Sequence, residues 1–303
     1  MEASLRHVCT GHSAALYALC PAPSPGLFLS AGGDGWITAW DYADPDVGRV
    51  IAQAPSKIFA LQTLTGGDNP VLIAGNMDGG LHQIFPGSPE RTRNIQHHRK
   101  GVFALCADGE WVWSAGGEGV LTRWRAEPFQ SMESVHLSHV SLRCIALDPH
   151  RRRMAVGASD SHIYVLDTDT LALLHTVRGA HVPSVFALRW DPIRPDRLLS
   201  GGRDAILREW HIGPDDVRML SEHPAHWYTV NDLAWSPDGQ LLATASRDKT
   251  VKIWDSAHLR LLKVLDAQRH GGHVNSVNRL LWSPQALLSC GDDRTVMIWD
   301  VRS

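Results

Sequence analysis

Cysteine and long apolar runs are scarce in this sequence, and both absences limit what the protein can be. The five cysteines are scattered, with no Cys-x-x-Cys pair, so neither a disulfide framework nor a zinc cluster is indicated. No apolar run approaches the roughly 20 residues that cross a membrane. Residues 1–12 lack the basic and apolar segments of a signal peptide. We therefore expect a soluble, cytoplasmic protein that does not bind membranes.

An excess of basic charge is also missing. The formal net charge is -3, with acidic and basic residues interleaved. General nucleic-acid binding needs a basic surface that neutralises phosphates, so we do not expect it here. The runs SGGRD and SAGGD read as turns and are not phosphate loops followed by a helix. We expect no cofactor, no metal ion and no small-molecule substrate.

Tryptophan is abundant, with twelve residues among 303, and its spacing reveals an internal repeat. In five segments a small hydroxyl residue is followed four positions later by an acid, and six positions after that by Trp. Two further segments keep only the acid. The acids recur every 40 to 45 residues, at Asp34, Asp78, Glu118, Asp160, Asp204, Asp248 and Asp293. A period of this length indicates a repeat architecture.

Each repeat unit predicts several short β-strands. Apolar and polar residues alternate over short runs, and Gly, Pro, Asp and Ser bound those runs. In residues 230–266, four strands are separated by turns at Pro237–Gly239, Arg247–Lys249 and Ser256–Ala257. No segment has a convincing helical period. The chain is therefore expected to be all-β.

The units resemble those of the WD40 repeat family, which open with Gly-His and close with Trp-Asp. Gly-His opens a unit at residues 11–12, and Trp-Asp closes units at residues 40–41, 254–255 and 299–300. The resemblance covers nearly the whole chain. It implies a single-domain, seven-bladed β-propeller over residues 1–303, with four-stranded antiparallel blades. Because the last unit lacks a fourth strand, we expect residues 3–9 to complete the last blade and close the ring.

The resemblance also implies a role for the recurring polar residues. In this family the acid accepts a hydrogen bond from a loop histidine, the histidine from the hydroxyl, and the hydroxyl from the indole. Such a buried network stabilises the fold only when every member is present, because an unpaired buried polar group costs roughly 1–3 kcal/mol. Complete tetrads are expected in four units, from His12, Ser30, Asp34 and Trp40, from His181, Ser200, Asp204 and Trp210, from His226, Thr244, Asp248 and Trp254, and from His273, Ser289, Asp293 and Trp299.

Three units depart from this pattern, and the second and fourth depart most. The third unit has a longer acid, in the set His98, Ser114, Glu118 and Trp124. In the fourth, the acid and histidine stand beside apolar replacements, in the set His139, Val156, Asp160 and Leu166. The second retains only the acid, in the set Ala74, Asp78 and Ile84. A catalytic triad would be expected once, with an oxyanion hole, so the repetition favours a structural role.

The variable residues beside the tetrads are the predicted partner-binding site. By resemblance they flank the mouth of the central channel, where WD40 proteins commonly bind partners. Five residues past the loop histidine, or at the aligned position, stand Tyr17, Phe59, Phe103, Arg143, Phe186, Asn231 and Asn278. Met77, Arg203 and Arg247 precede acids, and Trp227 and Tyr228 follow a histidine. Aromatic and arginine side chains are enriched in binding hot spots. The alternative is that the aromatic residues pack between the blades.

These observations predict a non-catalytic interaction scaffold that binds a protein or peptide partner on the tetrad-bearing face, as a monomeric propeller or as a subunit of a complex. Two other functions stay open. A structural subunit buried in a larger assembly would have an exposed apolar band on its rim. A propeller enzyme would need a cluster of ionisable residues lining the channel outside the tetrads, and the sequence shows no such cluster.

Overall fold

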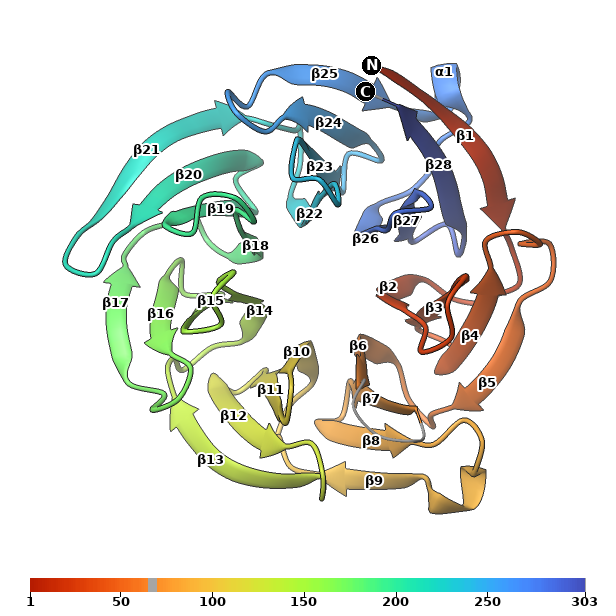
Figure 1. The fold of residues 1–303 in the computed structure, drawn as a ribbon, viewed down its shortest axis with the longest axis horizontal. Coiled ribbons are helices and arrows are strands. Elements are labelled where there is room, and N and C mark those ends of the chain that lie inside the picture. The colour runs from red at the N-terminus through yellow and green to blue at the C-terminus, as the bar shows by residue number, and fades with distance from the viewer. Residues whose placement is uncertain (65–69, 303) are drawn as a thin grey trace.

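The computed structural model describes residues 1–64 and 70–302, which form seven four-stranded antiparallel sheets arranged in a ring (Figure 1). Each sheet is one blade, and we name its strands a to d from the central channel outward. In six blades the strands pair in chain order, as short strands joined by tight turns must. The predicted seven-bladed β-propeller is confirmed.

The strands of each blade follow from the repeat. Blades 1 to 3 contain β2 (Leu16–Pro21), β3 (Leu27–Gly32), β4 (Trp36–Asp41) and β5 (Arg49–Gln53), then β6 (Ile58–Leu64), β7 (Val71–Asn76), β8 (Gly80–Ile84) and β9 (Arg93–Gln96), then β10 (Val102–Asp108), β11 (Trp111–Gly116), β12 (Val120–Arg125) and β13 (Gln130–His136). Blades 4 to 6 contain β14 (Leu142–Leu147), β15 (Arg153–Ala158), β16 (Ile163–Asp167) and β17 (Leu173–Val177), then β18 (Val185–Trp190), β19 (Arg197–Gly202), β20 (Ile206–Ile212) and β21 (Val217–Pro224), then β22 (Val230–Trp235), β23 (Leu241–Ser246), β24 (Val251–Asp255) and β25 (Leu261–Leu265). Blade 7 contains β26 (Val277–Trp282), β27 (Leu287–Gly291), β28 (Val296–Arg302) and β1 (Glu2–Cys9).

Two short helical segments lie in the connections and were not predicted. They are the 3-10 helix η1 (Pro89–Arg91) and the one-turn helix α1 (Ala267–His270). Helix α1 begins after Asp266, whose carboxylate accepts a hydrogen bond from the Arg269 amide, and ends at Gly271 with φ 65°. An Asp before the first residue and a Gly after the last are ordinary signals of a helix start and end. A helix of one turn is too short to show a helical period in the sequence.

The first and last strands close the ring. Strand β1 pairs antiparallel with β28, from Glu2 opposite Arg302 to Cys9 opposite Val296, and the two termini lie together in Figure 1. The Arg6 guanidinium forms an ion pair with Asp300 across this pair. The prediction that residues 3–9 complete the last blade is therefore confirmed, with β1 starting one residue earlier.

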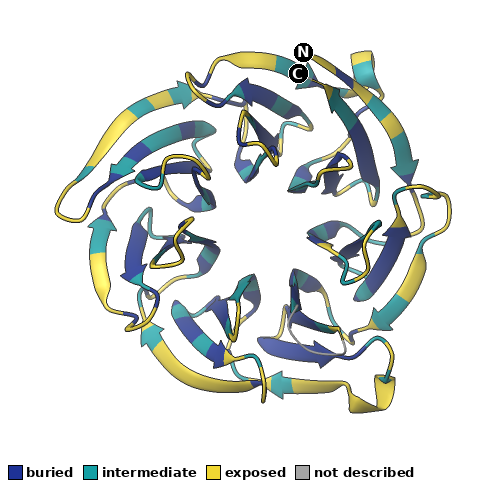
Figure 2. Cartoon of the chain, viewed as in Figure 1, coloured by how far each residue is buried: buried dark blue, intermediate teal, exposed yellow. Residues whose placement is uncertain are grey.

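Apolar burial holds the blades against one another. The inner strands are almost wholly buried, whereas exposed residues concentrate on the d strands and turns (Figure 2). Tryptophans at the ends of the innermost strands (strand a of each blade) add hydrogen bonds between blades. The Trp190 indole donates to the Ala146 carbonyl at 3.2 Å, and the Trp235 indole donates to the Trp190 carbonyl at 2.8 Å. The rigid ring positions the loops at the channel mouth.

Candidate functional site

Five blades contain a complete tetrad of hydrogen bonds. In blade 1, the His12 Nδ1 donates to Asp34 Oδ2, the Ser30 hydroxyl donates to His12 Nε2, and the Trp40 indole donates to Ser30 Oγ, each at 2.8 Å. The same three contacts, at 2.6 to 3.0 Å, occur in blades 3, 5, 6 and 7. Each tetrad joins the d–a loop before a blade to the b–c turn within it.

Blade 3 has the same network in spite of its longer acid. Glu118 Oε1 lies 2.6 Å from His98 Nδ1. The Glu118 side chain is 16% exposed, whereas that of Asp34 in blade 1 is 4% exposed. The extra methylene does not break the network, so the expectation that the tetrad of this blade is incomplete was wrong.

The tetrads are built for structure and not for nucleophilic chemistry. Burial lowers the pKa of His181 and of His226, so each imidazole is neutral and its Nδ1 hydrogen points to the carboxylate. Burial alone would raise the pKa of Asp204, but hydrogen bonds from His181 and Arg208 lower it to about 2. All five hydroxyl residues are fully buried: Ser30, Ser114, Ser200, Thr244 and Ser289. A hydroxyl with no exposed surface cannot meet a substrate.

Blade 4 uses a different polar pair at the same turn. The residue aligned with the loop histidines is Ser138, which is buried, whereas His139 is exposed. Asp160 accepts hydrogen bonds from the Ser138 hydroxyl at 2.5 Å and the Tyr164 hydroxyl at 2.6 Å. The assignment of His139 to this set was wrong by one position, because the shorter serine has replaced histidine and Tyr164 supplies the second donor.

Blade 2 replaces the tetrad by contacts within its own turn. Asn76 Oδ1 accepts from the amides of Asp78 and Gly80, at 3.0 and 2.8 Å. The Asn76 Nδ2 lies 3.0 Å from His82 Nε2. The Asp78 side chain, which aligns with the tetrad acids, is exposed. Blade 2 thus keeps an acid at this position of the repeat, but the acid does not take part in a tetrad.

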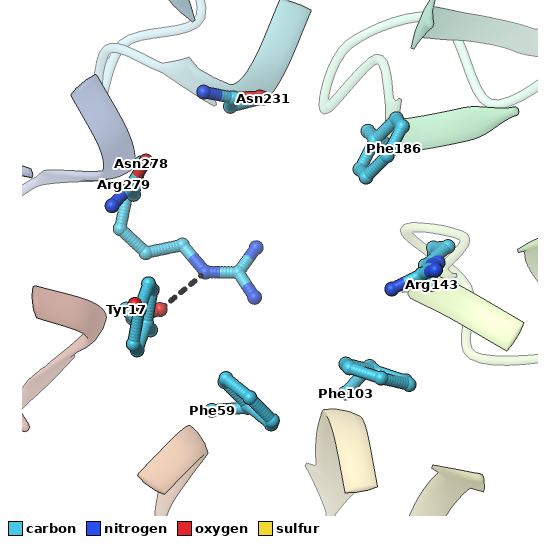
Figure 3. Close-up of a pocket in the computed structure, with 8 residues that line it drawn as sticks. All are labelled: Tyr17, Phe59, Phe103, Arg143, Phe186, Asn231, Asn278 and Arg279. Atoms are coloured by element: carbon cyan, nitrogen blue, oxygen red, sulfur yellow. Dashed lines mark hydrogen bonds between the residues drawn. The ribbon is translucent and has the colours of Figure 1, made fainter. Parts of the chain in front are cut away.

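The residues five positions past the loop histidines meet at one opening. They line a pocket of about 260 Å³ at the channel mouth, together with Arg279 (Figure 3). Each of these residues is the second residue of strand a in its blade. The ring symmetry therefore brings one such side chain from every blade to the same level of the channel. The complete lining is Tyr17, Phe59, Phe103, Arg143, Phe186, Asn231, Asn278 and Arg279.

One side of this pocket is aromatic. The rings of Tyr17 and Phe59 lie 5.3 Å apart, and those of Phe59 and Phe103 lie 5.2 Å apart, centroid to centroid. The Arg143 guanidinium lies 4.4 Å from the Phe103 centroid and 5.5 Å from the Phe186 centroid. These side chains are half-buried and face the pocket. They form an aromatic arc in which the Arg143 cation lies between Phe103 and Phe186.

The other side of the pocket is polar. The Asn231 amide donates to the Val277 carbonyl at 2.8 Å. The Asn278 amide donates to the Leu16 carbonyl at 2.9 Å and, within its own blade, to Asp292 Oδ1 at 2.7 Å. The Arg279 Nε donates to the Tyr17 carbonyl at 3.1 Å. Figure 3 shows the Arg279 guanidinium reaching into the middle of the opening. The polar groups are thus held in place by bonds to neighbouring blades.

The remaining predicted binding residues lie on the same face but outside the pocket. Met77, Arg203 and Arg247 occupy b–c turns and are exposed. Trp227 and Tyr228 lie in the d–a loop before β22 and are 87% and 60% exposed. Of these five, Arg247 and Tyr228 approach each other, with the guanidinium 6.0 Å from the ring centroid. The structure therefore separates the predicted site into a pocket and a surrounding surface.

Comparison with known proteins agrees with this geometry. The family described as WD domain, G-beta repeat matches residues 3–41, 217–255 and 261–300. The crystal structure of the WD40 β-propeller domain of Doa1 superimposes with a TM-score of 0.85, at 16% sequence identity, and covers 100% of this chain and 98% of that one. These three segments match WD40 repeats, and the chain has the fold of a WD40 β-propeller.

Relatives of this WD40 propeller are distant in sequence. Protein tipD of Dictyostelium discoideum is 20% identical over 96% of this chain. Actin-interacting protein 1 of Caenorhabditis elegans is 25% identical over 98% of this chain. The chain spans 48% of each of these relatives. Within the described part of the WD40 chain, no helix is long and apolar enough to cross a membrane.

The sequence analysis missed a cluster of charged residues in the channel of this WD40 propeller. Arg189, Asp232 and Arg279 line the channel below the pocket, so the expectation that no ionisable cluster lies there was wrong. The signal was present in the repeat. The third residue of the a strand is small in five blades, at Ala18, Ala60, Ala104, Cys144 and Ala187, but charged in the last two, at Asp232 and Arg279.

Proposed function

We propose that this WD40 propeller is a non-catalytic interaction platform that binds a protein or peptide partner on the face formed by its d–a loops and b–c turns. The observation that carries the proposal is the channel-mouth pocket, in which aromatic rings and arginines from different blades converge. A concave, partly apolar site with a few oriented polar groups is the common form of a binding site. The ring pre-organises it, so that little ordering is needed on binding.

Exposed apolar side chains around the pocket support the same face. Six large apolar residues of the d–a loops and b–c turns are 40% to 87% exposed: Met77, Val140, Val182, Trp227, Tyr228 and Val274. Tryptophan and tyrosine in particular are enriched in binding hot spots. A partner segment in the pocket would reach these side chains around its rim.

The name of one relative, actin-interacting protein 1, describes a protein interaction. That interaction belongs to that protein, and we propose the general role alone.

Among the channel groups, arginines stay protonated near neutral pH and so cannot exchange protons in acid–base catalysis. The cluster of Arg189, Asp232 and Arg279 therefore suits anion binding better than acid–base chemistry. The five unpaired cysteines fit the proposed cytoplasmic location, where thiols stay reduced.

A second candidate function is that of a subunit in a larger assembly, and one observation favours it. The outermost strands of blades 3 to 6 carry seven large apolar side chains that are 42% to 53% exposed, at Met132, Leu173, Leu174, Met219, Leu220, Leu261 and Leu262. These strands follow one another along the rim (Figure 1). Such a band is what a rim buried in an assembly requires.

Affinity purification with two matched variants tests both candidates. The pocket variant combines Phe103→Ala and Phe186→Ala in the pocket with Arg203→Glu on the surrounding surface. The rim variant combines Leu174→Ser, Leu220→Ser and Leu262→Ser. We expect the pocket variant to lose the partners of the wild-type chain and the rim variant to keep them. The opposite pattern would support the assembly subunit. Partners that survive both sets of changes would exclude both sites.

A further inference from the structure

We propose that the channel mouth recognises a carboxylate of an acidic peptide segment, an Asp or Glu side chain, through Arg279 and Arg143. This inference rests on the proposed function and names the ligand chemistry of the same pocket. Three features of the channel mouth support it: the charge balance of the channel, the geometry of the two guanidinium groups and the size of the pocket.

The channel holds more positive than negative charge. Asp232 is 1% exposed, and its Oδ1 accepts from Arg189 Nη2 at 3.2 Å while its Oδ2 accepts from the Leu280 amide at 3.0 Å. The Arg279 Nη1 lies farther from the same carboxylate, at 3.8 Å. One carboxylate thus faces two guanidinium groups. A charge in a partly desolvated site favours a counterion, and the remaining positive charge is on the side of the pocket.

Arg279 is held in a conformation that presents its terminal nitrogens. The hydrogen bond from its Nε to the Tyr17 carbonyl, at 3.1 Å, fixes the side chain across the junction between blades 7 and 1. Its side chain is 23% exposed, and its guanidinium lies in the middle of the opening in Figure 3. A planar guanidinium with free terminal nitrogens is matched to the two oxygens of a carboxylate.

Arg143 lines the pocket from the side opposite Arg279 (Figure 3). Its Nε donates to the Ser159 hydroxyl at 2.8 Å, and its guanidinium stacks on Phe103 and Phe186. Within residues 1–64 and 70–302, no carboxylate lies within ion-pair distance of it. Burial lowers the pKa of Arg143, because removal from water disfavours the charged guanidinium.

The two arginines decide against a cationic ligand. Aromatic rings can bind a lysine or a methylated lysine by cation–π contacts, but Arg143 already occupies the faces of Phe103 and Phe186. An incoming cation would also meet the Arg279 guanidinium. The remaining aromatic surface, on Tyr17 and Phe59, is free to contact an apolar residue beside the acid.

The size of the pocket favours a single side chain. About 260 Å³ accommodates one Asp or Glu side chain and part of a neighbour, and one carboxylate neutralises the one excess charge beside Asp232. A peptide that crosses the mouth would then place its apolar flank on the aromatic arc. Trp227 and Tyr228 lie on the same face and can contact the remaining residues of the peptide.

Selection from a library of short random peptides against the full 303-residue chain provides the probe. We expect enrichment of Asp or Glu next to an aromatic or aliphatic residue. The tightest peptide is then compared with its Glu→Gln or Asp→Asn counterpart by isothermal titration calorimetry. Loss of one charge-assisted, bidentate contact predicts at least roughly tenfold weaker binding. Enrichment of lysine or arginine instead would overturn the proposal.

Matched variants assign the effect to the pocket. Arg279→Met is expected to remove the tenfold preference for the acidic peptide. Arg279→Lys is expected to keep part of it, because lysine retains the positive charge but not the paired donors of a planar guanidinium. Arg152→Met is the control, because Arg152 is exposed in an a–b turn on the opposite face. Thermal unfolding of each variant shows that the fold is intact, and Arg143→Met provides a second variant if Arg279→Met does not fold.

The outcomes separate this inference from the proposed function. If peptides bind and lose affinity in Phe103→Ala but show no preference for the acid, the pocket is a binding site and the carboxylate proposal fails alone. If no selected peptide depends on Phe103, both proposals fail. A phosphoserine peptide and a peptide with a free C-terminal carboxylate are compared in parallel. Stronger dependence of either on Arg279 would assign the anion to that source and overturn the Asp or Glu assignment.

Discussion

Blades 2 and 6 hold the same turn in different ways. In blade 6, Asp248 accepts from His226 at 2.8 Å, from the Trp227 amide at 3.0 Å and from the Thr250 hydroxyl at 2.6 Å. In blade 2, Asn76 Oδ1 accepts from amides two and four residues away, and the Gln96 side-chain amide donates to the Asp78 carbonyl at 2.6 Å. In the first arrangement the acid of the turn bonds to a histidine 22 positions away, whereas in the second Asn76 bonds to groups within six positions of itself.

The difference shows that this turn can be held without the tetrad. In blade 2, Ala74 and Ile84 replace the hydroxyl and the indole, and both are buried. No hydroxyl or indole is then left without a partner, so the apolar set avoids the cost of an unpaired polar group. A tetrad that lacks one member, so that a buried polar group is left without a partner, is expected to be worse than either arrangement.

The largest effect is expected from removing the acid of blade 6. Asp248→Ala leaves His226, the Trp227 amide and Thr250 without their acceptor, and we expect a loss of about 3 kcal/mol in the free energy of unfolding. Asp78→Ala, its exposed counterpart in blade 2, should change that free energy by less than about 0.5 kcal/mol. Urea unfolding measures both. Equal effects of the two substitutions would contradict the comparison.

A somewhat smaller effect is expected at the residue after each acid, where both turns have positive φ. Gly79 has φ 89°, and a Cβ there would lie 2.1 Å from the His98 carbonyl oxygen. Gly79→Ala should destabilise the protein by about 2 kcal/mol, because the backbone of the next loop must move. Lys249 already adopts φ 73°, so Lys249→Gly should alter stability by less than about 1 kcal/mol. Chemical denaturation distinguishes them, and a neutral Gly79→Ala would refute the steric argument.

The hydroxyl of blade 6 tests the cost of an incomplete tetrad. Thr244→Val keeps the shape but leaves His226 Nε2 and the Trp254 indole unpaired, where they now lie 2.7 and 3.0 Å from Thr244 Oγ1. We expect a loss of roughly 1–2 kcal/mol. The control is Thr176→Val on the d strand of blade 4, which should be near neutral. A neutral Thr244→Val in thermal unfolding would mean that the network adds nothing beyond packing.

The smallest effect per residue is expected from pH, and it should appear in both kinds of blade. Burial lowers the pKa of His226 in blade 6 and of His82 in blade 2. The unfolded chain therefore binds more protons than the folded chain as the pH falls below about 6.5, so stability is lost in that range. The urea midpoint should be lower at pH 5.5 than at pH 7.5. A midpoint that rises on acidification would contradict the neutral, buried state of these histidines.

Much of the fold could be predicted because the repeat carries it in local signals. The turn at Pro237–Gly239 and the alternation around it predicted the strands of blade 6, and β22 to β25 lie where they were expected. The resemblance to WD40 proteins also predicted that Tyr17 and the aligned residue of each other unit flank the channel mouth, where the structure places them. Periodicity works here because each blade repeats the same geometry about one axis.

Where blades depart from the repeat, the sequence pattern was less informative. His139 was chosen over Ser138 because a histidine was expected, although the burial of the aligned position decides the role. Asn76 in blade 2 was overlooked, since its hydrogen bonds depend on a turn conformation that residue type alone does not specify.

The amino-acid sequence by itself determined the number of blades, the closure of the ring by the first strand, and the level at which seven variable side chains face the channel, because these follow from spacing and strand alternation. Only the tertiary structure decided what those side chains do together. Whether Arg143 stacks on two phenylalanines, and which arginine lies closest to Asp232, depends on distances between blades that are far apart in the chain. Charge balance in the channel is a property of the closed ring, and no single repeat contains it.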